Sequence, residues 1–256
     1  MKRLAPLWRR GGFPRSLLAP SETASVAWRR QFVQTYVERD IPQLGVAIPA
    51  HTLLRFWTMV AHYHGGVWNG AEAARSMGVS EPTARRYLDL LSGLFLLRQL
   101  QPWHENLKKR QVKAPKVYVR DSGILHALLG IETQRDLLSH PKLGASWEGA
   151  AIEWALDVLQ PRAAHFWATH QGAELDLLVV RGGRRYGIEV KRQDAPSLTS
   201  SMRVALADLS LAHLTVLYPG DEPYALAPNV SVVPMASLVK RDTAALIGRW
   251  RKRPTG

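Results

Sequence analysis

The chain contains no cysteine among its 256 residues. Disulfide bonds and thiolate metal sites are therefore excluded, and the composition is compatible with a reducing cytoplasm. No apolar run approaches the roughly 20 residues that are needed to span a bilayer. The apolar start at residues 4–8 is followed at once by Arg9 and Arg10, so it lacks the apolar core of a signal peptide. We expect a cytoplasmic protein with no membrane partner.

Acidic residues are scarce relative to basic ones. The chain has 21 Asp and Glu against 34 Lys and Arg, which gives a formal net charge of +13. A surplus of this sign favours a polyanionic partner over an acidic substrate, and DNA is the partner that we expect.

The sequence also lacks a phosphate-binding loop. The pattern Gly-x-x-x-x-Gly-Lys-Ser/Thr does not occur, and there is no Gly-Lys dipeptide anywhere. Without the backbone cradle and the lysine that hold the phosphates of a nucleotide, we expect no ATP cofactor and no ATPase activity from this chain alone.

What is present is a concentration of charge between Gly172 and Lys191. Residues 173–180 and 185–191 read as two strands, and the glycines between them predict the tight turn of a β-hairpin. Because strand side chains alternate between faces, Glu174 and Asp176 should share a face, and so should Glu189 and Lys191. The side chains expected on the opposite, apolar face are Leu175, Leu177, Ile188 and Val190.

These residue types suit the hydrolysis of a phosphodiester. Neighbouring carboxylates repel one another and favour a hard divalent cation such as Mg²⁺ or Mn²⁺, with Asp176 and Glu189 as ligands. A bound cation would polarise the phosphate, and the ammonium of Lys191 would offset negative charge. The alternative is a purely structural role, in which these charges form a solvated strand face and Lys191 pairs with a neighbour.

Asp176, Glu189 and Lys191 match the motif of the restriction-endonuclease-like superfamily, in which an aspartate is followed after a short hairpin by Glu-x-Lys. The order of expected elements also resembles that α-β-β-β-α-β core. The resemblance implies a glutamate from the preceding helix, residues 146–159, and Glu148 is our candidate for a catalytic residue and third metal ligand. Glu153 is the alternative, on the opposite side of the helix.

A second resemblance extends over nearly the whole chain. Gly12-Phe13-Pro14 matches a Gly-x-Pro signature in the lid of predicted prokaryotic AAA+ ATPases, and a helix is expected at residues 27–39. Other matching stretches are Pro115–Tyr118, Asp121-Ser122-Gly123, Leu143-Gly144 and the charged hairpin. The chain thus resembles the C-terminal domain of unknown function, type 4143, of those ATPases, without their ATPase domain. This implies a protein partner, either an ATPase in trans or a second copy of the chain.

Residues 51–130 predict a winged-helix module. Two short helices, 71–77 and 81–91, flank Gly78-Val79-Ser80, which is typical of a helix-turn-helix. Strands are expected at 95–100 and 117–120, with a basic loop between them as the wing. The nucleic-acid-binding candidates on the second helix and the loop are Arg85, Arg86, Lys108, Lys109, Arg110, Lys113 and Lys116. Such modules also serve as protein-docking domains.

We therefore predict an α/β protein with a winged-helix module, residues 51–130, followed by a restriction-endonuclease-like module, residues 146–256. An ATPase-lid remnant with a linker helix occupies residues 1–50, and a linker occupies 131–145. A last amphipathic helix is expected at residues 237–251. The predicted function is nucleic-acid binding with a metal-dependent deoxyribonuclease-like site. The alternative is a non-catalytic protein-interaction or DNA-docking module.

Overall fold

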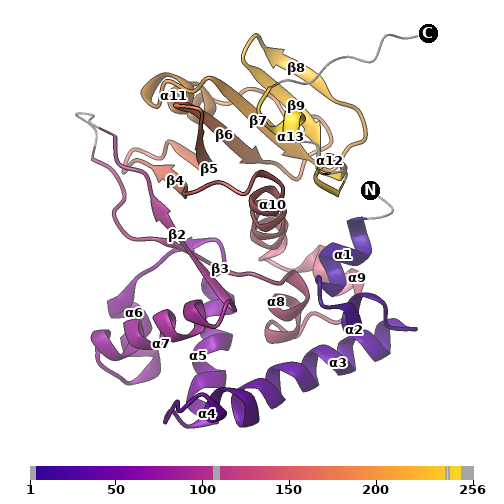
Figure 1. The fold of residues 1–256 in the computed structure, drawn as a ribbon, viewed down its shortest axis with the longest axis vertical. Helices are drawn as coiled ribbons and strands as arrows, with labels where there is room; N and C mark the ends of the chain where they lie inside the picture. Colours follow the sequence, from indigo (N-terminus) through magenta and orange to yellow (C-terminus); the bar gives the residue numbers. More distant parts are fainter. Residues whose placement is uncertain (1–3, 106–109, 240, 242, 249–256) are drawn as a thin grey trace. The chain divides into compact units, whose positions relative to one another are not determined.

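The computed structural model describes residues 4–105, 110–239, 241 and 243–248 (Figure 1). The chain divides into two compact units. We call the first, with described residues 4–99 and 114–150, the helical unit. The second, which includes residues 100–105, 110–113 and 151–239, is the sheet unit.

The helical unit begins with α1 (Leu4–Arg10), α2 (Pro14–Leu17) and α3 (Glu22–Thr35), followed by a π-helical turn, α4 (Ile41–Gln43) and α5 (Ala50–Tyr63). Ser21 begins α3 by accepting a hydrogen bond from the backbone of Ala24, so this helix starts five residues earlier than residue 27. Two stretches singled out in the sequence meet here, because the carboxylate of Asp121 accepts a hydrogen bond from the backbone N–H of Gly12 at 2.7 Å.

The two short helices predicted on either side of Gly78 are present. α6 (Gly70–Met77) ends at Gly78, whose φ of 68° is the left-handed conformation that glycine adopts without strain. α7 (Glu81–Gly93) begins at Ser80, whose hydroxyl accepts from the backbone of Thr83. The strands β1 (Gly66–Val67), β2 (Leu97–Pro102) and β3 (Lys116–Val119) follow the order β1-β3-β2, with β1 antiparallel to β3.

The predicted linker at residues 131–145 contains ordered structure of the helical unit. After α8 (Ser122–Leu128), the chain forms α9 (Gln134–Ser139) and then enters α10 (Leu143–Leu159). Thr133 and Asp136 form a reciprocal capping box at the start of α9. Buried side chains of α5, α6, α7, β3 and α8 make one apolar core in this unit.

The sheet unit is built around a mixed sheet. Its strands are β4 (Ala164–Ala168), β5 (Glu174–Arg181), β6 (Arg184–Val190), β7 (His213–Tyr218), β8 (Tyr224–Ala227) and β9 (Val230–Pro234). Their order is β4-β5-β6-β7-β9-β8, and Gln101 and Pro102 of β2 pair with β4. β5 and β6 are antiparallel, whereas β6 and β7 are parallel and joined through α11 (Ser200–Asp208). The predicted α/β class and the element order of this region are confirmed.

The last predicted helix was wrong in its extent. In place of one helix over residues 237–251, the structure has the short helices α12 (Ala236–Val239) and α13 (Thr243–Leu246). Arg241, between them, has a φ of 54°, a left-handed conformation that interrupts a right-handed helix. Residues 249–251 lie outside the described part of the chain. Among the described helices, none has the length and apolar character that crossing a membrane requires.

Candidate functional site

The charged hairpin forms as predicted. β5 and β6 pair from Leu177 opposite Ile188 to Arg181 opposite Arg184. Between them, Gly182 and Gly183 have φ values of 56° and 72°, which is the pair of positive φ angles that a two-residue type I′ turn requires. The turn fixes the register, and the register carries Asp176 on β5 towards Glu189 on β6.

The strict alternation of faces along β5 was wrong. Leu175 and Leu178 both belong to the apolar cluster that includes Val216 and side chains of α11, although they are three positions apart. The cause is a shift in the β4–β5 register, where β5 uses one residue more than β4 between the pairs His165–Leu178 and Trp167–Leu175. Asp176 lies within this bulge, so its direction does not follow from counting residues.

The contacts of the two carboxylates lie at the end of β6 and just beyond it. Asp176 Oδ2 accepts a hydrogen bond from the backbone N–H of Val190 at 2.8 Å, beyond the ladder pair of Leu177 and Ile188. Glu189 Oε1 accepts from Lys191 Nζ at 2.7 Å. Asp176 and Glu189 are only 6% and 5% exposed, whereas the side chain of Lys191 is 31% exposed. The structure therefore brings these three predicted residues to one region, with the ammonium closest to solvent.

The two carboxylates account for part of the ligand set that Mg²⁺ requires. Mg²⁺ is commonly held by one or two carboxylates together with water and substrate phosphate, and Asp176 and Glu189 supply two. A cluster of three or more Asp, Glu or His side chains suited to a metal does not occur among the described residues. Any cation would depend on these two carboxylates and on non-protein ligands.

Glu148, the predicted third ligand, has contacts of its own within the helical unit. Its Oε1 accepts a hydrogen bond from the hydroxyl of Tyr118 at 2.6 Å and one from Lys116 Nζ at 3.2 Å. Glu148 is thus part of a polar cluster with two side chains of β3. The sequence pattern could have indicated it, because Lys116 and Tyr118 are two apart on a strand and share a face.

The prediction that Lys116 belongs to the basic loop of the wing was wrong. Lys116 begins β3, is 4% exposed and pairs with Glu148, since a buried ammonium requires a charged partner. Arg110 and Lys113 are exposed, as a loop that contacts phosphates requires. Lys108 and Lys109 lie outside the described residues.

The two arginines of α7 differ in their surroundings. Arg85 Nε lies 3.1 Å from a carboxylate oxygen of Asp89, one turn further along the helix. Arg86 is exposed and lines a shallow groove beside residues 46–48. A contact of these arginines with DNA stays a prediction.

His64 takes part in a buried arrangement that sequence reasoning missed. Its Nδ1 accepts from the backbone N–H of Val119 at 2.9 Å, so Nε2 carries the proton and donates to the carbonyl of Ala145 at 3.1 Å. Burial lowers the pKa of His64 to about 3. It is a neutral structural histidine, and no feature of its local sequence distinguishes it from His62.

Residues 1–135 match the family described as Domain of unknown function (DUF8612), and residues 143–238 match Domain of unknown function (DUF4143). The predicted resemblance to the 4143-type domain is thus confirmed for the second half of the chain. The first half instead matches the other family.

The chain is similar to two curated mycobacterial proteins. "Uncharacterized protein Mb2031c" of Mycobacterium bovis and "Uncharacterized protein Rv2008c" of Mycobacterium tuberculosis are each 52% identical over 228 residues. These matches cover 89% of this chain and 52% of each relative, so the chain spans about half the length of the relatives. The crystal structure of protein VC1899 from Vibrio cholerae aligns with a TM-score of 0.26 and 11% identity, over 91% of this chain and 56% of that chain.

Proposed function

This chain belongs to the family described as Domain of unknown function (DUF8612), and because that description carries no activity, we propose a function from the chain's own residues. The proposal is a nucleic-acid-binding protein whose sheet unit holds a phosphodiesterase site dependent on Mg²⁺ or Mn²⁺. Asp176 and Glu189 would hold the cation, and Lys191 would act on the phosphate.

One observation carries the proposal: two buried carboxylates on β5 and β6 lie in one region with a partly exposed lysine that directly follows β6. Two buried negative charges in one region are costly unless cations compensate them. Lys191 supplies one positive charge to Glu189 at 2.7 Å, and a divalent ion would supply the rest. When bound, such a cation polarises a phosphodiester and lowers the pKa of a water ligand.

The roles of the protein groups follow from their positions. Asp176 is oriented by the Val190 N–H, which fixes one of its carboxylate oxygens and thereby the direction of the carboxylate group. Lys191 is close enough to solvent to meet a phosphate that approaches Glu189, and its ammonium would stabilise negative charge that develops there.

The element order supports this proposal. The chain runs α10, β4, β5, β6, α11 and β7, with β4-β5-β6 antiparallel and β7 parallel to β6. This is the α-β-β-β-α-β order expected for a restriction-endonuclease-like module. In the helical unit, α5, α6 and α7 with the strand order β1-β3-β2 support the winged-helix proposal.

Cation binding and cleavage test the proposal directly. We expect Mn²⁺ to bind by calorimetry, and branched, single-stranded or duplex DNA to be cleaved only when Mg²⁺ or Mn²⁺ is added. Asp176→Asn and Glu189→Gln should abolish binding and cleavage. Lys191→Ala should keep cation binding and slow cleavage by roughly 10²-fold, because the ammonium assists without ligating.

Asp157→Asn is the matched control. It removes one carboxylate charge from an exposed ion pair with Arg241, in the same unit, and should change neither binding nor cleavage. Failure of the native chain to bind Mn²⁺, or equal effects of all three carboxylate variants, would exclude the site.

A non-catalytic interaction module is the second candidate, and the burial of Asp176 and Glu189 favours it. Both carboxylates already accept hydrogen bonds within the chain, which is how a purely structural polar group behaves. If this is their whole role, Asp176→Asn and Glu189→Gln should lower the unfolding temperature, and the native chain should bind no cation. The partner would then be an ATPase in trans or a second copy of the chain.

A further inference from the structure

The helical unit has an apolar groove that is independent of the hairpin. Its volume is about 330 Å³, and its lining residues are Val46, Ala47, Ile48, Arg86 and Leu90. Leu44, just before the groove on the same segment, is 62% exposed. Val46, Ile48 and Leu90 are half-buried and pack with their inner sides on the core of the unit. The groove therefore has a fixed apolar wall and is open to solvent.

Arg86 is the charged residue of this lining. It is exposed, and within the part of the chain that the structure describes its guanidinium makes neither a hydrogen bond nor an ion pair. Arg85, the preceding residue of α7, instead pairs with Asp89. The groove thus joins hydrocarbon walls to a positive charge whose donors remain open to a ligand.

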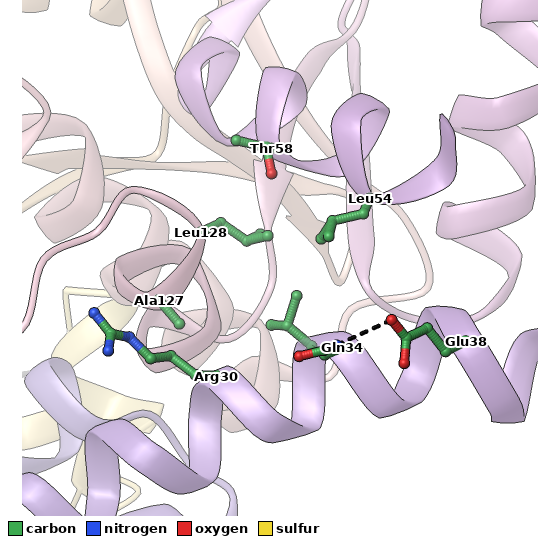
Figure 2. Close-up of a pocket in the computed structure, with 8 residues that line it drawn as sticks. Arg30, Gln34, Glu38, Leu54, Thr58, Ala127 and Leu128 are labelled. Atoms are coloured by element: carbon green, nitrogen blue, oxygen red, sulfur yellow. Dashed lines mark hydrogen bonds between the residues drawn. The ribbon is translucent and has the colours of Figure 1, made fainter. Parts of the chain in front are cut away.

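A second hollow of the same unit lacks this property. Figure 2 shows it between side chains of α3, α5 and α8, and it encloses about 250 Å³. Its charged groups have partners in the chain: Arg30 pairs with Glu132, and Glu38 accepts a hydrogen bond from Gln34 at 3.0 Å. That hollow therefore offers a ligand no charge without a partner in the described chain, whereas the groove at Arg86 offers a positive one.

We propose that the groove at Arg86 binds a peptide segment of a partner protein, in which a bulky apolar side chain lies one helical turn from an aspartate or glutamate. The apolar side chain would cover Val46, Ile48 and Leu90, and the carboxylate would accept the fork of donors that Arg86 presents. The net charge of +13 favours an acidic segment.

Duplex DNA is a poorer occupant for this groove. Phosphate oxygens would gain from Arg86 but nothing from the apolar wall, whose burial is the larger source of free energy for a small contact. The proposal therefore assigns Arg86 to protein recognition, in contrast to its sequence-based role in contacting DNA. It does not depend on the phosphodiesterase site.

The probe for the test is a phage-displayed library of random peptides of about 12 residues, the length of a short recognition helix. The full chain is the bait, and the peptides that emerge are synthesised and measured by fluorescence anisotropy. We expect Leu, Ile, Met or Phe four positions from Asp or Glu in these peptides. Arg86→Gln should weaken their binding by about tenfold or more, as should Val46→Asp, which places a charge on the apolar wall.

Arg85→Gln is the matched control, because it removes the same charge from the adjacent position of the same helix. It should leave peptide binding within about twofold, since Arg85 is outside the lining and paired with Asp89. Circular dichroism and the unfolding midpoint of each variant confirm that it is folded.

Three results would overturn the proposal. The library could yield no peptides of this pattern, or the peptides could bind Arg86→Gln as well as the native chain. The third is an equal loss for Arg85→Gln and Arg86→Gln together with displacement of the peptide by duplex DNA, which would assign both arginines to a nucleic-acid surface.

Discussion

His64 and His126 are buried in the helical unit, and burial lowers their pKa values to about 3 and about 4. Each ring is held by two partners. His126 Nδ1 donates to the carbonyl of Arg9 at 2.9 Å, and Nε2 accepts from the hydroxyl of Ser146 at 2.7 Å. A proton added to either ring would have to enter this buried network, so the native state excludes it.

This exclusion predicts a loss of stability in acid. Below the ordinary histidine pKa of about 6.5, the unfolded chain takes up protons that the native chain refuses, so the free energy of unfolding should fall as the pH falls. The stabilisation that the neutral histidines provide is complete above about pH 6.5. Below that pH, the free energy of unfolding falls by about 1.4 kcal/mol per pH unit for each histidine, until the pH reaches the pKa of that histidine in the folded protein. Urea unfolding at about pH 7, 6 and 5 measures the slope.

Ring proton shifts in NMR spectra provide the control for that interpretation. The signals of His64 and His126 should keep their neutral positions between about pH 7 and pH 5 in the folded protein. Titration of either ring near pH 6.5 would show that its burial does not hold it neutral.

Helix α10 carries two glycines with opposite surroundings. A Cβ at Gly149 would lie 2.3 Å from His64 Nε2 and 3.2 Å from the ring of Tyr118, whereas a Cβ at Gly144 would meet no atom within 4 Å. Both positions lie within α10, and the difference in their surroundings reports the packing of His64 against the helix.

Alanine at these two positions should act in opposite directions. Gly149→Ala should lower the free energy of unfolding by about 1–3 kcal/mol, since the ring of His64 is fixed by its hydrogen bonds and must shift. Gly144→Ala should leave stability unchanged or raise it by up to about 1 kcal/mol, because alanine is the better helix former. Urea denaturation of both variants decides, and equal effects would mean that His64 does not pack as described.

The basic residues of the whole molecule do not all contribute to an electrostatic surface. Lys113 is exposed, whereas Lys116 is buried and paired with Glu148. A net charge of +13 predicts binding to polyanions that weakens as salt rises, but only exposed cations can displace counterions from phosphates.

The salt dependence of DNA affinity should distinguish Lys113 from Lys116. The affinity for duplex DNA, measured by anisotropy between about 50 and 200 mM salt, should fall steeply, with a slope near −0.9 per phosphate contacted. Lys113→Ala should reduce the slope by up to about one contact. Lys116→Ala should leave it unchanged and instead destabilise the fold, because Glu148 loses a partner. A native affinity that does not change with salt would argue against phosphate contacts altogether.

Local signals in the sequence determined much of the architecture. Gly182 and Gly183 between alternating strands were sufficient for the hairpin, and Gly78 with Ser80 for the turn between α6 and α7, because turns and caps depend on residues a few positions apart. The hairpin also determined that Asp176, Glu189 and Lys191 would lie in one region.

Only the tertiary structure decided how those side chains are used. The bulge at Asp176 arises from pairing with β4, and the burial of Lys116 arises from a glutamate 32 positions away. The break at Arg241 also depends on residues far back in the chain. The guanidinium of Arg241 donates a hydrogen bond to Asp157, and the backbone of α13 accepts one from Thr215. These features depend on partners that are distant in sequence, and residue periodicity contains no information about which distant groups will meet.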